Sequence, residues 1–140
     1  MEYEKLKNYE RYWRANQSIE QRIMAMKSAE TSITPQAGDG SQHIGAHDQM
    51  KAVDMRVDWC ASHSDDYAKN LAVMREVDKA IDSLQDPLER EILRLRYTDF
   101  RYGTQMTWTQ VKKALYGIIS VGERTIYRLH DDAIYHLKNI

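Results

Sequence analysis

The chain of 140 residues contains one cysteine, two prolines and six glycines, and these shortages exclude several classes of protein. A single cysteine, Cys60, cannot form an internal disulfide bond, which fits a protein of the reducing cytoplasm. Proline and glycine are the residues that interrupt helices, so their scarcity favours long helices. The sequence therefore predicts an all-α fold without internal disulfide bonds.

Long hydrophobic runs are also missing. No stretch of 18 apolar residues occurs in the chain, so no transmembrane helix and no membrane partner are expected. The opening stretch MEYEKLKNYERYW carries too many charges for a signal peptide. With 42% hydrophobic and 29% charged residues, the chain has enough of both to bury a core and stay in solution. We expect a cytoplasmic protein.

The patterns of common catalytic sites are absent from the sequence. It has no glycine-rich phosphate loop and no pair of carboxylates set apart for acid–base work. Cys60 is followed by His63 three residues later, but no group nearby would stabilise an oxyanion. We expect neither an enzyme nor a cofactor.

Zinc binding is the alternative that this region leaves open. His43, His47, Cys60 and His63 follow the spacing H-x3-H and then C-x2-H, and imidazole and thiolate are zinc ligands. Two of these histidines, however, lie in a glycine-rich stretch, and Cys60 fits an apolar helical stripe. The sequence therefore predicts no metal site.

Apolar residues at helical spacing predict a long helical hairpin over residues 1–84. We expect one helix over 2–29, a flexible connector over about 31–47, and a second helix over 48–84 with Asp48 as its N-cap. The second helix carries a heptad stripe, formed by Val53, Val57, Cys60, Ser64, Tyr67, Leu71, Met74, Asp78 and Ile81. Because neither helix buries its stripe alone, the hairpin is expected to form a homodimer or to contact a partner.

The net charge of −1 hides a difference between the two parts of the chain. Residues 87–140 contain 9 basic and 6 acidic residues, and residues 1–86 contain 11 and 15. A basic excess of this size favours an anionic partner for the C-terminal part only weakly.

Residues 85–140 are expected to form a separate domain of three helices. Asp86 and Pro87 are typical of a helix start, and Thr107 with Gln110 has the spacing of a capping box. The last helix is expected from about Gly122 to Lys138. A helix, a short capped helix and a final helix with a polar start match the plan of a helix-turn-helix domain.

In that plan the last helix enters the major groove of DNA. Arginine pairs with guanine, glutamate accepts from cytosine, and the threonine methyl touches thymine. Residues of the short helix lie nearer the phosphates. The predicted base-reading residues are Glu123, Arg124, Thr125, Tyr127 and Arg128, and the predicted phosphate-side residues are Thr107, Thr109, Lys112 and Lys113.

Other polar and aromatic residues of this part have a simpler interpretation. Tyr97, Trp108 and Tyr116 are expected in the core rather than in stacking on bases. Arg94 and Arg101 remain open between a solvated surface and contact with phosphate.

The segments LQDPLEREILRLRY, MTWTQVKKAL and ERTIYRLHDDAIYHL resemble region 4 of bacterial sigma-70-type factors, over about residues 84–137. The layout of the whole chain is similar to the phage-encoded regulators of the ArpU and RinA type. This resemblance implies a sigma-like helix-turn-helix that faces DNA with the same five residues of the last helix. The stretch LYGIISVGERT is longer than the family's usual turn, so the register of the reading residues is open by about one position.

The sequence and the resemblance together predict a sequence-specific transcriptional regulator of phage or prophage genes, more specifically an activator. Its expected partners are double-stranded DNA, a second copy of the chain and the host RNA polymerase. Two alternatives remain: a small terminase-like protein that recognises a DNA packaging site, and a helical protein-interaction module.

Overall fold

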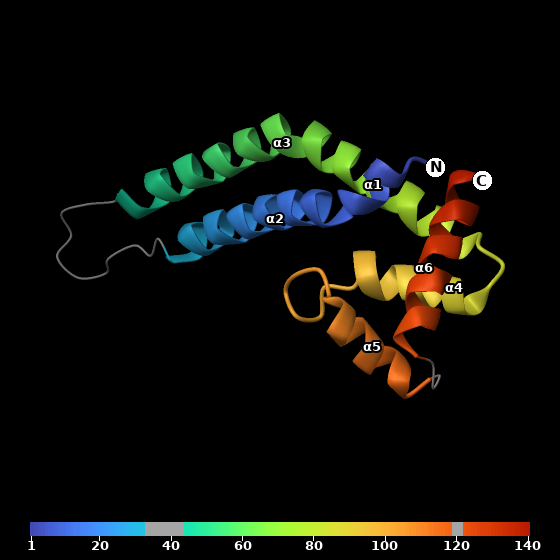
Figure 1. The fold of residues 1–140 in the computed structure, drawn as a ribbon. Helices are drawn as coiled ribbons and strands as arrows, with labels where there is room; N and C mark the ends of the chain where they lie inside the picture. The colour runs from blue at the N-terminus through green and yellow to red at the C-terminus, as the bar shows by residue number, and fades with distance from the viewer. Residues whose placement is uncertain (33–43, 119–121) are drawn as a thin grey trace. The chain divides into compact units, whose positions relative to one another are not determined.

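The computed structural model describes residues 1–32, 44–118 and 122–140, and within them every regular element is a helix (Figure 1). The prediction of an all-α fold is confirmed. None of the helices in these ranges is long and apolar enough to cross a membrane. The elements in chain order are α1 (Tyr3–Lys7), α2 (Tyr9–Ser32), α3 (Ile44–Asp82), α4 (Pro87–Leu93), the π-helix η1 (Arg94–Thr98), α5 (Trp108–Tyr116) and α6 (Glu123–Lys138).

Two compact units divide the chain. The first contains residues 1–13 and 71–140, and the second contains residues 14–70. The predicted domain boundary, between Leu84 and Gln85, falls inside the first unit, because α1 and the last turns of α3 share a core with α4 and α6. The connector predicted over 31–47 lies for the most part outside the described residues.

The ends of the long helices differ from the prediction. The expected helix over 2–29 is divided at Asn8, which ends α1 with its N–H bonded to the carbonyl of Glu4, and α2 then continues to Ser32. Asp48 is not an N-cap, because α3 begins four residues earlier at Ile44. The preference of aspartate for a helix start is a local propensity, and here the helix extends past it.

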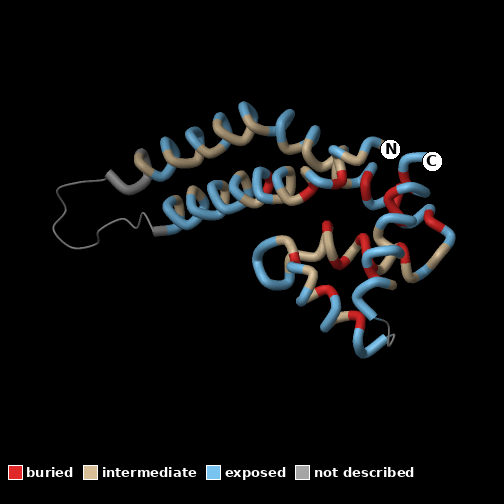
Figure 2. The backbone as a smooth tube through the Cα atoms, in the orientation of Figure 1, coloured by how far each residue is buried: buried red, intermediate tan, exposed pale blue. Residues whose placement is uncertain are grey.

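The core of the first unit consists of two clusters of buried side chains, which account for the buried positions among the C-terminal helices in Figure 2. One cluster joins α1, α3, α4 and α6 and contains Leu6, Ile81, Leu93, Tyr97 and Leu137 among others. The second lies within the C-terminal helices and contains Ile92, Leu95, Met106, Val111, Leu115 and Ile126.

The aromatic residues predicted for this core behave differently from one another. Tyr97 is buried, and Trp108 is partly buried against the second cluster. Tyr116 is 75% exposed, so its prediction as a core residue is wrong. Buried Val111 and Leu115 define the inner face of α5, and Tyr116 is rotated by about 100° from Leu115 around the helix.

The second unit is an antiparallel pair of helices with a seam of mixed polarity. Amide and carboxylate groups cross it: Asn70 donates to Asn16 at 3.0 Å, and Arg56 pairs with Glu30. The predicted heptad stripe is therefore wrong at Val57 and Ser64, which are exposed, and Arg56 rather than Val57 lies toward α2.

Candidate nucleic-acid interface

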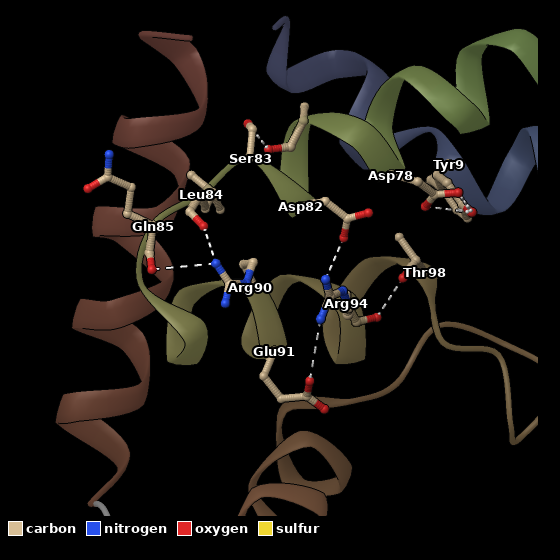
Figure 3. A network of polar contacts seen from close by, with 11 residues as sticks. Tyr9, Asp78, Asp82, Ser83, Leu84, Gln85, Arg90, Glu91, Arg94 and Thr98 are labelled. Atoms are coloured by element: carbon tan, nitrogen blue, oxygen red, sulfur yellow. Dashed lines mark hydrogen bonds and ion pairs between the residues drawn. The ribbon is translucent and has the colours of Figure 1, made fainter.

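The link between α3 and α4 is fixed by hydrogen bonds at the start of α4. Asp86 is the N-cap, as predicted, and its carboxylate accepts from the N–H of Leu88 at 2.9 Å, with Pro87 in the first turn. The guanidinium of Arg90 reaches back and donates to the carbonyls of Leu84 and Gln85 (Figure 3). These contacts fix the direction in which α4 leaves the end of α3.

Arg94 and Arg101, the two arginines that the sequence left open, both have carboxylate partners. Arg94 pairs with Asp82 at the end of α3 (Figure 3), and Arg101 pairs with Asp99 at 2.6 Å. The hydrogen bond from Arg101 lowers the pKa of the Asp99 carboxyl. Phosphate contact by either arginine would require breaking an existing ion pair.

The π-helix η1 turns successive side chains toward different cores. Its wider turn lets Leu95 enter the second cluster while Tyr97 enters the first. Between them, Arg96 donates to the carbonyl of Met106 and lies 4.8 Å from the centre of the Trp108 ring. The sequence pattern gave no signal of this π-helix. Through Arg96 and the carbonyl of Met106 it is bonded to the loop that precedes α5.

The capping box predicted for α5 is present. The hydroxyl of Thr107 accepts from the N–H of Gln110 at 3.3 Å, and the side chain of Gln110 accepts from the N–H of Thr107 at 3.0 Å. With Val111 and Leu115 buried, the helix exposes the predicted phosphate-side residues Thr107, Thr109, Lys112 and Lys113.

Helix α6 begins at Glu123, with Gly122 as an N-cap in extended conformation (φ −73°, ψ 164°) and no capping side chain. Its buried stripe contains Ile126, Ala133, Ile134 and Leu137. Of the five predicted reading residues, the structure exposes Glu123, Arg124, Tyr127 and Arg128, and leaves Thr125 partly buried.

The start of α6 contacts α5 through one ion pair and one aromatic pair. Lys112 lies 3.5 Å from the carboxylate of Glu123, and the Trp108 ring packs edge-on against Tyr127 at 5.1 Å. The hollow beside these residues measures about 30 Å³, so the two helices are closely packed. Glu123 thus has Lys112 as an ion-pair partner at the start of α6.

The basic part of α6 ends after two turns. Arg124 and Arg128 are one turn apart on the exposed side, and the next turn brings Asp131 and Asp132, both exposed. Two carboxylates at this point would repel phosphate, so only the first two turns of α6 suit an anionic ligand.

His130 is a partly buried residue with several contacts that the sequence did not single out. Its Nε2 accepts from the Tyr97 hydroxyl at 2.7 Å, its Nδ1 donates to Asp131 at 3.1 Å, and its ring meets Trp108 edge-on at 4.9 Å. Burial lowers the pKa of His130. Neutral His130 thus fixes the rotation of α6 relative to η1 and α5.

A second histidine of α6 holds the opposite end of the helix. Nδ1 of His136 donates to the buried carboxylate of Glu89 at 2.9 Å, and this bond raises the pKa of His136. A raised pKa means that the stabilisation is present below the ordinary value of 6.5 and is lost as the pH rises through the folded-state pKa. For His130 the lowered pKa makes stability fall as the pH decreases below 6.5.

We therefore expect the two histidine variants to change the pH dependence of unfolding in opposite directions. His136→Gln should lose more stability relative to the unmodified chain at about pH 5.5 than at about pH 8. For His130→Gln, the loss in free energy of unfolding relative to the unmodified chain should be larger at about pH 8 than at about pH 5.5. Urea unfolding at both pH values measures these differences, and parallel pH curves for the two variants would contradict the assigned contacts.

Gly122 offers a simple test of the start of α6. A side chain there meets no other atom within 4 Å, and the backbone angles suit any residue. Gly122→Ser should therefore raise the free energy of unfolding by about 0.5–1 kcal/mol, because serine caps the helix and restricts the unfolded chain. Thermal unfolding measures the gain, and Gly117→Ser, at an equally open position that caps no helix start, is the control.

Metal-ligating side chains do not gather in the parts of the chain that the structure describes. Of the zinc alternative, Cys60 and His63 border the same hollow of the second unit, but His63 Nδ1 is bonded to the carbonyl of Trp59 at 2.8 Å. His43 lies outside the described residues, as does the side chain of His47.

Comparison of the chain with models of protein families, with characterised proteins and with solved structures gives no match.

Proposed function

We propose that the chain is a sequence-specific DNA-binding regulator of transcription, and that α5 and the first two turns of α6 form its DNA-reading surface. The observation that carries the proposal is the exposed pair of Arg124 and Arg128 on the side of α6 opposite its buried stripe, with exposed Tyr127 between that side and α5. Lys112 and Lys113 extend the same basic character onto α5. A helix with this distribution suits a major groove better than a protein core.

Each residue has a distinct role in this proposal. Arg124 and Arg128 read base edges, because a guanidinium can donate two parallel bonds to guanine. Lys113 and the exposed hydroxyls of Thr107 and Thr109 contact phosphates and fix the orientation. Glu123 positions Lys112, its ion-pair partner, at the edge of the DNA-reading surface.

The resemblance to phage-encoded regulators supports a role in activating phage or prophage genes. A DNA-bound regulator of this size can act by contacting the host RNA polymerase, and two copies would read two half-sites. We expect these half-sites to be separated by one or two turns of the duplex, about 10 or 21 base pairs between centres.

The decisive experiment is selection of bound sequences from a random duplex library at moderate salt, with the purified full chain. Enrichment of one motif is the expected result, and a pair of half-sites would reveal two bound copies. Failure of any sequence to enrich, with the protein folded by circular dichroism, would overturn the proposal and favour a protein-interaction module. Binding that is insensitive to salt would do the same, because phosphate contacts release counterions.

A further inference from the structure

The second unit, residues 14–70, lacks an apolar core of its own in the part that the structure describes. All buried hydrophobic residues belong to the first unit, and Asn16 is the buried residue of the second. In Figure 2 the two long helices show intermediate exposure along one side and full exposure on the other. An isolated pair of helices with so little burial has no strong driving force to stay paired.

Contacts across this unit fix the direction of its helices. Tyr67 donates to Glu20 at 2.6 Å, and Asn70 bonds Asn16, so the helices are antiparallel. Trp59 and His63, one turn apart on α3, stack their rings at 4.0 Å beside this seam.

Two hollows open along this pair of helices. One of about 270 Å³ is lined by Ile19, Ile23, Cys60, Ser64 and Tyr67 among others, and its surface is mainly apolar. The other, of about 280 Å³, is lined by Gln49, Met50, Val53 and Asp54.

Exposed apolar side chains follow the hollows at helical spacing. Met50, Val57 and Ser64 follow one another at intervals of seven residues, so they lie along one side of α3. Met50 and Val57 are 68% and 52% exposed, and Met24, one turn after Glu20 on α2, is 68% exposed. We call this surface the hollow face, formed by Ile23, Met24, Met50, Val57, Ala61 and Ser64.

We propose that a second copy of the chain covers the hollow face and completes a four-helix bundle. The projected area of the face is of the same order as the area that each partner buries in a standard dimer. Residues 14–32 of α2 extend about 28 Å, and two adjacent helices are about 20 Å wide. The resulting 560 Å² of flat projection, enlarged by side-chain relief, approaches the roughly 800 Å² that each partner buries in a standard interface.

Charge on the hollow face also suits a second copy. Ionic residues of both signs lie beside it: Glu20 and Asp54 each line one of the hollows, and Lys27 follows Glu20 by seven residues on α2. A two-fold axis brings the same surface to itself, so a face of mixed sign meets complementary charges, whereas a field of one sign would repel its copy. Asn16 and Asn70 bond each other across the seam, and buried polar pairs of this kind fix the register of helices in bundles.

Ala61→Arg is the sharpest test of this interface. Ala61 is exposed on the hollow face, and arginine is a good helix former, so the single chain should tolerate it. In the dimer it would place a charge inside the interface. Ala25→Arg is the matched control, because Ala25 is equally exposed on α2 but lies on the other side of the seam.

Sedimentation equilibrium of the full chain without DNA measures the association. The unmodified chain and Ala25→Arg are expected at twice the monomer mass of 16.4 kDa, and Ala61→Arg at or near the monomer mass. The thiol of Cys60, which lines the larger hollow, should react faster with a bulky maleimide in Ala61→Arg alone, with helicity checked by circular dichroism.

Three outcomes would overturn the proposal. They are a monomeric unmodified chain, a dimer that survives Ala61→Arg but not Ala25→Arg, and a larger ring-like oligomer. A monomer would leave the hollow face to a different protein. Because no DNA is present, these results are independent of whether α6 reads a sequence.

Discussion

Leu115→Ala is expected to lower the free energy of unfolding by about 2–5 kcal/mol. Leu115 is fully buried on α5, in the cluster that also contains Ile92, Met106, Val111 and Ile126. Removing its isobutyl group loses the transfer free energy of the side chain and leaves a cavity beneath both helices of the candidate interface. Urea unfolding followed by circular dichroism measures the change.

Tyr116→Ala, at the next position, is the matched control. Its side chain is 75% exposed, so the substitution should change stability by no more than about 0.5 kcal/mol. Equal losses in the two variants would mean that α5 has a different rotation from the one described. The Leu115→Ala variant should also bind DNA more weakly, because α5 positions the start of α6 through Trp108 and Lys112.

Short-range features of this fold could be predicted from the sequence, because they depend on residues a few positions apart. The N-cap Asp86, with Pro87 after it, and the reciprocal bonds of Thr107 and Gln110 are determined within one helical turn. The same is true of the apolar stripe of α6: spacing predicts Ile126, Leu129, Ala133, Ile134 and Leu137, and the structure buries all of these except Leu129, which is partly buried.

Features that depend on tertiary contacts could not be predicted. In the hairpin, a stripe from Val53 to Cys60 can pass through Val57 or through Arg56, because both routes combine one step of three and one of four residues. An apolar stripe favours Val57. The structure selects Arg56 because Glu30 across the seam pairs with it. Likewise, no local pattern distinguishes the π-helix η1 from a continuing α-helix, and its position follows from the packing of Leu95 and Tyr97 into two separate clusters.

Some features of the candidate site could likewise be predicted from the sequence, and others could not. Exposure of Arg124 and Arg128 follows from their positions opposite the apolar stripe, so the sequence was sufficient for them. The Lys112–Glu123 ion pair joins two helices across a turn, and residue spacing gives no information about it.

Alanine substitution of Arg124 or Arg128 is expected to weaken binding to the preferred DNA sequence by about 1–3 kcal/mol and to relax the preference at one base position. Both side chains are exposed, and they project from the first two turns of α6, ahead of the acidic third turn. Loss of a bidentate contact removes discrimination between guanine and other bases, so the preferred sequence should suffer most. Competition binding with single-base variants of the selected site measures this effect.

Lys113→Ala and Arg22→Ala separate base reading from general electrostatics. Lys113 is exposed on α5, so its loss should weaken all duplexes alike and reduce the slope of log K against log salt by about 1. Arg22 is exposed on α2 in the second unit, and its removal takes away the same charge while leaving site preference intact. If Arg124→Ala and Arg128→Ala behaved like Lys113→Ala, both arginines would be phosphate contacts, and base reading would belong to other residues of α6. If they behaved like Arg22→Ala, α6 would not be the reading helix.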